Sequence, residues 1–526
     1  MSCSSSVAPI LRTWLIVLVT LSFSLLPHAS QAAPPIFHLP TFVDAGAFAT
    51  ESAAVADVNR DGKPDLVVAV QNDPFGAHLT NGLVSVLLGN GDGTFGTPVT
   101  YDSAGIDAVS VAVADLNGDG APDIIVGNVC GGGSGTCSLT TAGVLLGRGD
   151  GTFAPAVAVN LGGSSSQQIA IADVNGDGKP DLLAIVAAPF NGAVAILLGK
   201  GDGTFQVPTL ALLGAMNMYS LAVGDVNGDG RPDVVASGAG SNSGGHSRGV
   251  ARVLLGNGDG TFQILPTIYD SGVSAGGWAN SVALGDLNGD GALDLAIANY
   301  PDSTTGVLLG NGDGTFGSTV LYDSGSRFAW VNTIADVNGD SKLDVIVANA
   351  AGAVGVLLGK GDGTLQPPET YAIPGDALSV VAADMNRDGR PDLAVAVGNN
   401  LMAILLNSSP CGSTAPIVTA AAAPTTLWPP NGRTIPVSLS GSIVASGCSL
   451  NLTSARYVVQ DEYGQVQPQG TIAIGDDGTF SFNVQLLASR RGDDRNGRKY
   501  TITISAQTTA GAIGSAMAIV TVPHNQ

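Results

Sequence analysis

The chain has 526 residues, a formal net charge of −22 and 73 glycines, but only 12% charged residues. Its length leaves room for more than one domain, and its acidity argues against nucleic-acid binding, which needs a basic surface. A composition rich in Gly and small apolar residues and poor in aromatic residues is typical of an all-β protein with many turns.

Residues 1–32 have the features of a secretory signal peptide. Arg12 precedes an apolar run, residues 14–26, that is too short to span a bilayer and is ended by Pro27. Ser30 and Ala32 supply the small residues of a cleavage site, so we expect cleavage after Ala32. The protein is therefore predicted to be secreted, whether extracellular, periplasmic or cell-surface, and no later segment is apolar enough to form a transmembrane anchor.

Four cysteines remain after this cleavage, and an even number in an exported chain predicts disulfides. Cys130 and Cys137 flank a short glycine-rich loop that can close on itself, which leaves Cys411 to pair with Cys448. The predicted disulfides are Cys130–Cys137 and Cys411–Cys448, although the sequence alone leaves the connectivity open. No CxxC motif or His cluster accompanies them, which argues against a metal–thiolate site.

A nine-residue segment, residues 115–123 in its second copy, occurs seven times at intervals of about fifty to sixty residues. Such a recurrence predicts a repeat architecture. Every copy has Asp at positions one, five and nine and Asn at position three, and six of the copies have Gly at position six. Apolar runs flank each copy, so we expect the segment to join two strands.

These segments have the donor pattern of a calcium loop. Ca²⁺ takes about six to eight oxygen ligands, and the first half of the EF-hand loop supplies them at the same alternating positions. Gly at position six permits the positive φ of a sharp turn, and the carbonyl of position seven can turn inward. We expect up to seven Ca²⁺ ions, one per repeat. The predicted metal-binding side chains are Asp57, Asn59, Asp61, Asp65, Asp115, Asn117, Asp119, Asp123, Asp173, Asn175, Asp177, Asp181, Asp225, Asn227, Asp229, Asp233, Asp286, Asn288, Asp290, Asp294, Asp336, Asn338, Asp340, Asp344, Asp384, Asn386, Asp388 and Asp392.

The alternative to a calcium loop is a metal-free hairpin turn rich in Asp, Asn and Gly. Clusters of three carboxylates without a counter-ion repel one another, and the chain contains seven such clusters. They hold about half of the 43 acidic residues. The negative charge is therefore interpreted mainly as a property of metal sites.

Most repeats carry a second signature, residues 87–95 in the first copy, in which Gly-Asp-Gly between apolar runs predicts a hairpin. One repeat then has four antiparallel strands, the size of a propeller blade. The seventh copy lacks this signature, but residues 36–44 resemble the segment that follows it elsewhere. We expect this N-terminal strand to complete the last blade, so that residues 33–407 form a closed seven-bladed β-propeller without a long free edge.

The paired signatures resemble FG-GAP/VCBS repeats, similar to those of the integrin α-subunit propeller and of many secreted bacterial proteins. The resemblance covers roughly residues 36–407. It implies a seven-bladed propeller with Ca²⁺ in the loops between the first two strands of blades, but no single activity. The sequence departs from the pattern at Ser341, which replaces the turn Gly, and at Leu293 and Leu343, which replace Pro. A non-Gly residue at positive φ costs on the order of 1 kcal/mol, so we expect the sixth site to be the weakest.

Residues 408–416 have the composition of a linker. Residues 417–526 then show six or seven short β-periodic segments, which suggest an immunoglobulin-like β-sandwich. Within them, residues 427–431 and 461–464 resemble bacterial Ig-like modules. The predicted fold class is all-β, a seven-bladed β-propeller followed by an Ig-like β-sandwich.

No set of nucleophile, base and acid stands out, and no catalytic residue is predicted. Two Gly-x-Ser-x-Gly matches, residues 245–249 and 272–276, lie in variable loops rather than on the strand-to-helix turn that the motif requires. A glycosidase pair would need carboxylates outside the calcium loops; the candidates are Glu51, Glu369, Asp376 and Glu462. Residues 491–493 read Arg-Gly-Asp, the tripeptide that integrins recognise, but a bare tripeptide among charged residues is interpreted as a solvated polar turn.

The face opposite the calcium loops is the predicted ligand face. Tyr219, Trp278 and Trp330 fall in equivalent loops ahead of three calcium segments. Aromatic rings with polar neighbours suit sugar or peptide recognition, whereas the alternative is packing between blades. We expect a non-catalytic adhesion or recognition module that binds carbohydrate or protein outside the cell. The competing hypotheses are a polysaccharide lyase or glycosidase with its site at the propeller mouth, and a structural spacer.

Overall fold

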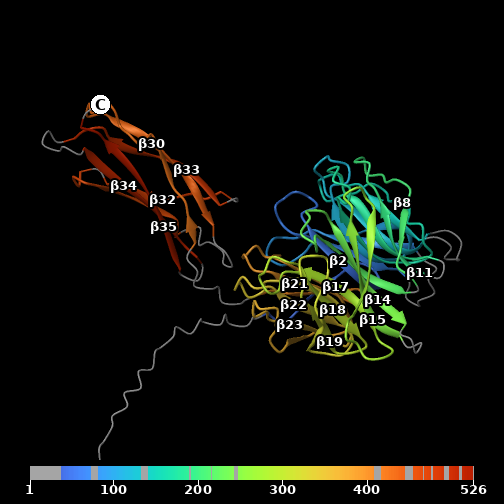
Figure 1. The fold of residues 1–526 in the computed structure, drawn as a ribbon. Helices are drawn as coiled ribbons and strands as arrows, with labels where there is room; N and C mark the ends of the chain where they lie inside the picture. The colour runs from blue at the N-terminus through green and yellow to red at the C-terminus, as the bar shows by residue number, and fades with distance from the viewer. Residues whose placement is uncertain are drawn as a thin grey trace, which may run out of the picture. The chain divides into compact units, whose positions relative to one another are not determined.

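The computed structural model describes residues 37–72, 81–131, 140–188, 191–214, 216–241, 247–407, 416–444, 454–465, 467–475, 478–490, 497–508 and 512–524. The named elements in these ranges are all β-strands (Figure 1), which confirms the all-β prediction. Across the same ranges, no helix has the length and apolar character needed to cross a bilayer. The predicted signal peptide, residues 1–32, lies outside the described residues.

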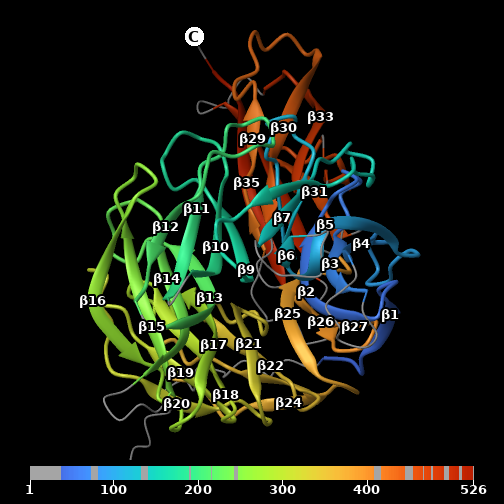
Figure 2. The same ribbon diagram turned by 90° about the vertical axis from the view of Figure 1, so that its right-hand side faces the viewer.

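Residues 37–407 repeat one antiparallel four-strand unit. The first strand of each unit ends one residue before the first Asp of a calcium segment. These inner strands are β2 (Ala49–Ala56), β5 (Val99–Ala114), β9 (Ser166–Ala172), β13 (Asn217–Gly224), β17 (Trp278–Gly285), β21 (Ala329–Ala335) and β25 (Ala377–Ala383). In Figure 2 the labelled inner strands surround a common centre.

The second strand of each unit begins at the ninth residue of the calcium segment, so this segment joins two strands as predicted. The second strands are β3 (Asp65–Gln71), β6 (Asp123–Gly131), β10 (Asp181–Ala188), β14 (Asp233–Ser241), β18 (Asp294–Tyr300), β22 (Asp344–Asn349) and β26 (Asp392–Val397). The third strands are β4 (Asn81–Leu87), β7 (Thr141–Leu145), β11 (Asn191–Leu197), β15 (Ser247–Gly256), β19 (Thr304–Leu308), β23 (Ala353–Leu357) and β27 (Leu401–Leu405). The outer strands are β8 (Val157–Asn160), β12 (Thr209–Leu212), β16 (Phe262–Asp270), β20 (Val320–Asp323), β24 (Glu369–Ala372) and β1 (Thr41–Asp44).

Strand β5 serves two neighbouring units. Its first half pairs with β4 as an outer strand, from Val99 opposite Val86 to Ile106 opposite Asn81. Its second half pairs with β6 as an inner strand and ends with Ala114 opposite Asp123. The two units therefore form one seven-stranded sheet, whereas the other units described in residues 37–407 form separate four-stranded sheets.

The ring of sheets is closed by the two ends of this region. Each inner strand contacts the next in chain order, and β25 contacts β2. Strand β1 pairs with β27, with Thr41 opposite Ile404 and Asp44 opposite Leu401, and β1 lies beside β27 in Figure 2. Phe37 adds a bridge to Asn407. The prediction that the N-terminal strand completes the last sheet is confirmed for residues 37–44.

Hydrophobic clusters fill the spaces between neighbouring sheets. Between the third and fourth units, for example, Leu183 and Ile185 of β10 pack with Leu221 of β13 and Val234 of β14. These side chains are almost completely buried. Burial of one such side chain contributes about 1.5–3 kcal/mol. The second strands have apolar residues on both faces because each is covered by a neighbouring sheet on either side.

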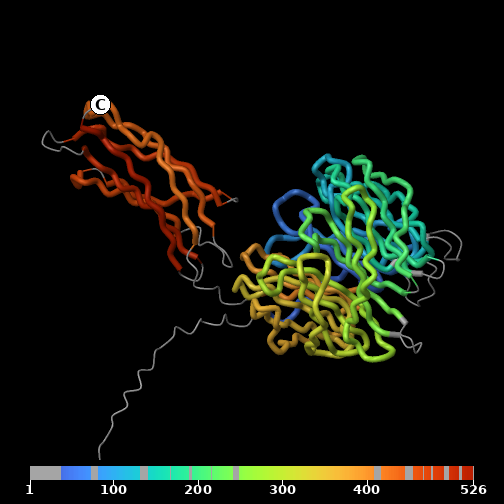
Figure 3. The backbone as a smooth tube through the Cα atoms, in the orientation of Figure 1, coloured from blue at the N-terminus to red at the C-terminus, as the bar shows by residue number. Residues whose placement is uncertain are grey.

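The described residues from 416 onward form two sheets. One contains β28 (Ile417–Val418), β30 (Thr434–Val444), β29 (Ala421–Ala423) and β33 (Thr479–Leu487), and the other contains β32 (Gln469–Thr471), β31 (Arg456–Asp461), β34 (Arg498–Gln507) and β35 (Ile513–Val522). They lie as two layers (Figures 1 and 3). Residues of both sheets, such as Val437 and Ile502, share one core. This arrangement is a β-sandwich; its assignment as Ig-like stays a prediction.

A buried ion pair stabilises one end of the second sheet. The guanidinium of Arg498 donates from Nε to Oδ1 of Asp461 over 2.9 Å. The same guanidinium lies 4.9 Å from the ring centroids of both Tyr463 and Tyr500. Arg498 is completely buried. Because a buried charge is tolerated only when it is paired and hydrogen-bonded, this arrangement is interpreted as structural.

The predicted disulfides are only partly within the described residues. Cys130 is buried near the end of β6 and is disulfide-bonded. Cys137, Cys411 and Cys448 lie outside the described residues, as do residues 408–415 of the predicted linker. The pairing therefore stays a prediction.

Candidate functional site

The calcium segments are coiled by hydrogen bonds from their own backbone. In the second segment, Asp115 accepts from the N–H groups of Gly118 and Gly120, each over 2.8 Å. Asn117 Oδ1 accepts from Asp119 N over 2.9 Å, and Asp119 Oδ1 accepts from Ala121 N over 2.7 Å. Short polar side chains form such local bonds readily. The chain is thereby wound around the oxygens of positions one, three and five.

The carboxylate at position nine anchors each segment to the rest of its sheet. Asp123 accepts from Leu116 N over 2.9 Å and from Gly147 N over 2.7 Å. In every copy the position-nine Asp is 0% exposed and accepts one N–H bond from its own segment and one from a residue at or just after the end of the third strand. These residues are Asp65, Asp123, Asp181, Asp233, Asp294, Asp344 and Asp392. The second signature needs Gly at this contact, because a Cβ on Gly147 would lie 2.1 Å from the carbonyl oxygen of Pro122.

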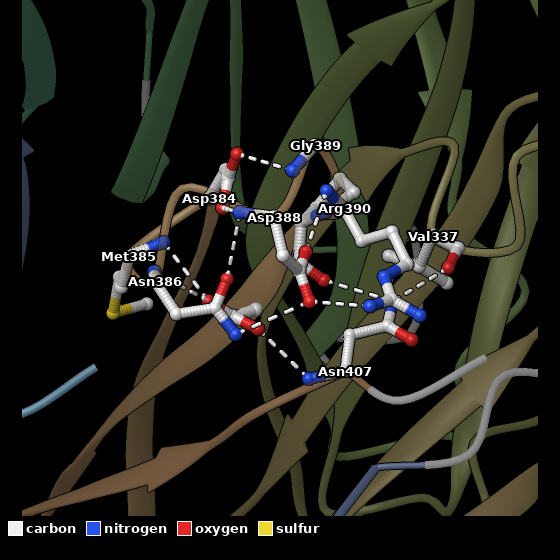
Figure 4. A network of polar contacts seen from close by, with 10 residues as sticks. Val337, Asp384, Met385, Asn386, Asp388, Gly389, Arg390 and Asn407 are labelled. Atoms are coloured by element: carbon white, nitrogen blue, oxygen red, sulfur yellow. Dashed lines mark hydrogen bonds and ion pairs between the residues drawn. The ribbon is translucent and has the colours of Figure 1, made fainter. Parts of the chain in front are cut away.

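The seventh segment shows the same anchor without this glycine (Figure 4). Asp384 accepts from Asp388 N over 2.9 Å and from Gly389 N over 2.7 Å, while Arg390 Nη2 donates to Asp388 Oδ2 over 2.6 Å. Asn407 takes the place of Gly and donates its backbone N–H to Asp392 Oδ1 over 2.8 Å. Its amide also donates to the carbonyl of Val337 over 2.7 Å, so this segment is tied to the preceding sheet.

The donor chemistry of these segments fits Ca²⁺, which prefers hard oxygen ligands. Carboxylates at positions one and five and an amide oxygen at position three lie on one coiled stretch. Their charges act on one another: burial first, and then repulsion from Asp336 and Asp340, raise the pKa of Asp344 to about 7. A divalent cation would relieve that repulsion. Within the described ranges, no three His, Cys, Asp or Glu side chains converge as a ready metal cluster.

Two positions of the segment require a left-handed backbone. At position six Ser341 has φ 63°, where the other copies have Gly, as the sequence predicted. Position four is also left-handed, and there Arg60 and Arg387, both with φ 61°, replace the Gly of the other copies. The requirement at position four was not predicted. Non-Gly residues at such φ values are strained.

A cavity of about 310 Å³ lies at the other end of the inner strands. We call it the mouth cavity. It is lined by one residue of each repeat at the place six residues before the first calcium-segment Asp. These residues are Glu51, Val109, Gln167, Tyr219, Asn280, Trp330 and Leu378. Trp278 and several serines complete the lining.

A β-bulge places these side chains in the mouth cavity. In β13 the register with β14 shifts between Met218 and Ser220, so Tyr219 has no partner in the ladder. The same shift occurs at the equivalent place in the other inner strands. A bulge interrupts the alternation of side chains and re-aims one of them. The same β-bulge therefore carries a different side chain in each repeat.

The predicted aromatic residues line this cavity, but their predicted location in loops is wrong. Tyr219, Trp278 and Trp330 belong to the inner strands β13, β17 and β21 themselves. The bulge has no sequence signal of its own, so the sequence does not reveal that the inner strands extend to residues 219, 278 and 330. All three side chains are partly exposed rather than buried between sheets.

Two further rings extend the aromatic group. Tyr300, the last residue of β18, stacks on Trp278 with ring centroids 4.7 Å apart and lies edge-on to Trp330 at 5.5 Å. Phe328 stacks on Tyr300 at 5.4 Å, and Tyr219 lies 6.1 Å from Trp278. Phe328 has φ 64°, a strained value for a bulky residue. We call these five residues the aromatic wall.

Polar groups hold the aromatic wall in place. Trp278 Nε1 donates to Asn280 Oδ1 over 3.2 Å, and Asn280 Nδ2 donates to the carbonyl of Trp330 over 2.8 Å. Just below, Ser220 Oγ accepts from Val282 N of the next inner strand over 3.2 Å. Such bonds fix the rings at their positions before any ligand arrives.

The opposite side of the mouth cavity carries a carboxylate. Glu51 lines the cavity from β2, and burial, followed by repulsion from Asp107, raises its pKa to about 7. Among the described residues the lining contains no Lys or Arg. Of the carboxylates proposed for a glycosidase pair, Glu51 alone lines this cavity, within the described part of the chain.

Within the described residues, the remaining motifs add no second site. The motif at residues 272–276 lies between β16 and β17, where Ser274 Oγ donates to Asp302 Oδ1 over 2.7 Å. Residues 245 and 246 of the other match and the Arg-Gly-Asp tripeptide at residues 491–493 lie outside the described residues.

Comparison with solved structures finds distant similarity. A lectin of Agrocybe aegerita that recognises non-reducing terminal N-acetylglucosamine is 20% identical, with a TM-score of 0.41, 64% of this chain and 91% of that chain covered. BBS1N in complex with ARL6DN is 12% identical, with a TM-score of 0.46, 70% of this chain and 96% of that chain covered. These similarities are too low to carry function to this chain. No curated protein matches the sequence significantly.

Comparison with protein families finds six matches to one model, the FG-GAP-like repeat. They cover residues 57–126, 132–184, 185–236, 239–297, 286–346 and 336–395, which is more than half of the chain. Each match contains at least part of the calcium segments and strands described above. The chain belongs to the FG-GAP-like repeat family.

Proposed function

We propose that this protein is an exported, calcium-stabilised, seven-bladed β-propeller that recognises carbohydrate, without catalysis, at its mouth cavity. The observation that carries the proposal is the aromatic wall, of which Tyr219, Trp278 and Trp330 line a cavity of about 310 Å³. This volume is at the lower end of the usual range for ligand pockets, about 300–1,000 Å³. Aromatic faces cover the apolar side of a sugar ring, and Gln167, Asn280 and nearby serines offer hydrogen bonds to its hydroxyl groups.

Seven blades and Ca²⁺ form part of this proposal. The seventh calcium segment, residues 384–392, lies entirely within the last family match, and its bonds repeat those of the other six. Strands β25, β26, β27 and β1 supply the matching sheet. Ca²⁺ bound by positions one, three and five of each segment would neutralise the carboxylates and stiffen the end of the ring opposite the mouth cavity. The secreted location follows from the signal sequence expected at residues 1–32.

The competing functions receive less support. A polysaccharide lyase acts next to a sugar carboxylate, which Glu51 would repel in a cavity whose described lining contains no cation. A glycosidase needs two carboxyl groups facing the substrate, and Glu51 alone lines the cavity within the described residues. A function as a structural spacer does not explain the strained backbone of Phe328 or the partly exposed tryptophans. A protein ligand remains the alternative outcome of the test.

Replacement of Trp330 by Ala tests the proposal. We expect glycan-array and calorimetric binding to weaken by about 1–3 kcal/mol, as for an aromatic interface anchor, while the free energy of unfolding changes by under about 1 kcal/mol. Trp428→Ala is the matched control, because Trp428 is 43% exposed and belongs to the C-terminal sandwich. Binding of a peptide library but of no glycan would replace carbohydrate by protein. Release of shortened sugars would reinstate an enzyme.

A further inference from the structure

We propose that the mouth cavity selects a sugar unit that carries a positive charge, an ammonium group, with Glu51 as its counter-charge. This inference rests on the proposed carbohydrate function and narrows it to amino sugars. It is carried by the position of Glu51 opposite the aromatic wall and by the absence of a hydrogen bond or ion pair to its carboxylate from any described residue.

Glu51 is an unpartnered acid in a shielded place. It occupies the bulge of β2, where the register with β3 shifts between Thr50 and Ser52, and it lines the mouth cavity. No hydrogen bond or ion pair joins its side chain to another described residue. A shielded carboxylate without a partner costs free energy. That cost is explained if a ligand supplies the missing positive charge.

A second acid reinforces the negative field. Asp107 of β5 is buried and has φ 53°, a left-handed value that a non-Gly residue adopts at a cost. Its repulsion adds to burial in raising the pKa of Glu51 to about 7. A cation bound in the cavity beside Glu51 and the rings would reverse that shift, because an opposite charge favours the ionised form.

None of the strands packed against β2 carries a cation, although the guanidinium of Arg327 lies 5.0 Å from the ring centroid of Phe328 in the aromatic wall. Strand β2 packs against β3, β5, β25, β26 and β27, and the charged residues of these strands are all acidic. Asp65 and Asp392 begin β3 and β26 at the calcium end, and Asp102 lies in the outer half of β5. Asp107 alone acts on Glu51 from these strands. The field inside the mouth cavity is therefore negative.

The aromatic wall favours the same ligand charge. The faces of Trp and Tyr rings attract cations through their negative electrostatic potential. Tyr219, Trp278 and Trp330 present such rings in the same cavity lining as Glu51, and Tyr300 stacks on Trp278. Rings plus a carboxylate recognise an ammonium group, whereas rings alone would serve a neutral sugar equally well.

The test compares two sugar chains of equal length and linkage, a β-1,4-linked glucosamine hexamer and a β-1,4-linked glucose hexamer. Calorimetry at pH 6.5 with the full chain in excess Ca²⁺ should give about tenfold tighter binding of the glucosamine hexamer. Glu51→Gln keeps the shape of the side chain and removes its charge. We expect this variant to bind both hexamers within about threefold of the affinity of the unmodified protein for the glucose hexamer.

Asp376→Asn is the matched control for overall charge, because Asp376 is exposed just before β25 and outside the cavity lining. It should preserve the tenfold preference. Equal binding of both hexamers by the unmodified protein, or an unchanged preference in Glu51→Gln, would overturn the inference. An equal loss of preference in Asp376→Asn would also overturn it, because the selection would then come from net charge.

If neither hexamer binds, the proposed carbohydrate function fails, and a cation without a sugar then decides the charge selection. Tetramethylammonium should shift the indole NMR signals of Trp278 and Trp330 in the unmodified protein but not in Glu51→Gln. Absence of this difference would overturn the charge selection independently of carbohydrate binding.

Discussion

The two ends of the inner strands differ in whether the repeats share the same side chains. At the calcium end each described repeat has the same Asp, Asn and Asp, and the same buried Asp at position nine. At the mouth end the bulge also recurs, but its side chain changes from Glu51 to Val109, Gln167, Tyr219, Asn280, Trp330 and Leu378. The calcium segments have the same polar side chains in every repeat, whereas the mouth end has the same backbone bulge with different side chains.

The difference follows from what each end must satisfy. The position-nine carboxylate accepts backbone N–H bonds from its own segment and from the next turn, so any other side chain would leave buried donors without partners. A bulge side chain that lines the mouth cavity accepts no such set of backbone N–H bonds. Identity at the calcium end is therefore explained by folding, and diversity at the mouth end leaves room for recognition.

The largest expected effect is loss of a position-nine anchor. Asp233→Ala removes the acceptor of the N–H groups of Val226 and Gly256. Bonds to a charged group contribute about 1.5–3 kcal/mol each, so we expect a loss of about 3–5 kcal/mol in the free energy of unfolding, measured by denaturant titration. Gln167→Ala at the exposed mouth end should change it by less than about 0.5 kcal/mol.

This experiment can contradict the inferred difference between the two ends in their importance for folding. The loss in Asp233→Ala should persist in chelator, because the two hydrogen bonds do not require a metal. If the loss appears only with Ca²⁺, position nine acts mainly as a ligand. If Gln167→Ala costs as much as Asp233→Ala, the two ends do not differ in their importance for folding.

Calcium removal should affect the two ends unequally. A ligand that binds only the native state stabilises it by about 2.7 kcal/mol for a site at one hundred times its dissociation constant. We expect millimolar Ca²⁺ to raise Tm and chelator to lower it. Trp330→Ala should respond in the same way as the unmodified protein, because its ring lies at the other end. Identical melting curves after verified metal removal would contradict the calcium proposal.

Glu51 should lower stability at high pH. Its pKa rises from 4.5 to about 7 on folding, so the native state holds its proton where the unfolded chain has lost it. Stability therefore falls as pH rises from about 4.5 to 7 and stays lower above that. Glu51→Gln should raise the free energy of unfolding by about 1–3 kcal/mol at pH 8 and by little at pH 4. A variant that is no more stable at pH 8 would remove the evidence that Glu51 is kept at a cost.

Much of the fold could be predicted because the sequence repeats one strand-and-turn pattern. Seven copies of one segment revealed the strand pairs around it, and the missing signature after residue 392 pointed to the pairing of residues 37–44 with β27. The spacing of Tyr219 and Trp330 also placed them correctly at the mouth. These features depend on local turns and on counting residues.

The remaining features depend on tertiary structure. The bulge, the role of Asp123 as an anchor, and the approach of Tyr300 and Phe328 to Trp278 arise from pairing between strands or sheets. Tyr300 ends a second strand rather than a first, so counting from the calcium segments could not find it. The left-handed backbone of Arg60 became visible only with its φ value.

The smallest expected effect concerns a departure within the repeated end. Ser341 has φ 63° where Gly stands in the other copies. The left-handed conformation costs a non-Gly residue about 1–2 kcal/mol, whereas Gly loses about 0.5–1 kcal/mol of additional chain entropy on folding. Ser341→Gly should therefore stabilise the protein by about 0.5–1 kcal/mol.

The reciprocal variant is Gly178→Ser, whose new Cβ would meet nothing within 4 Å, so that only the backbone conformational free energy changes. It should destabilise by the same amount. Equal and opposite shifts in the denaturation midpoint would show that the calcium segments are interchangeable units. A neutral Ser341→Gly beside a destabilising Gly178→Ser would mean that the sixth segment has adapted to its serine and that the repeated end is less uniform than its sequence.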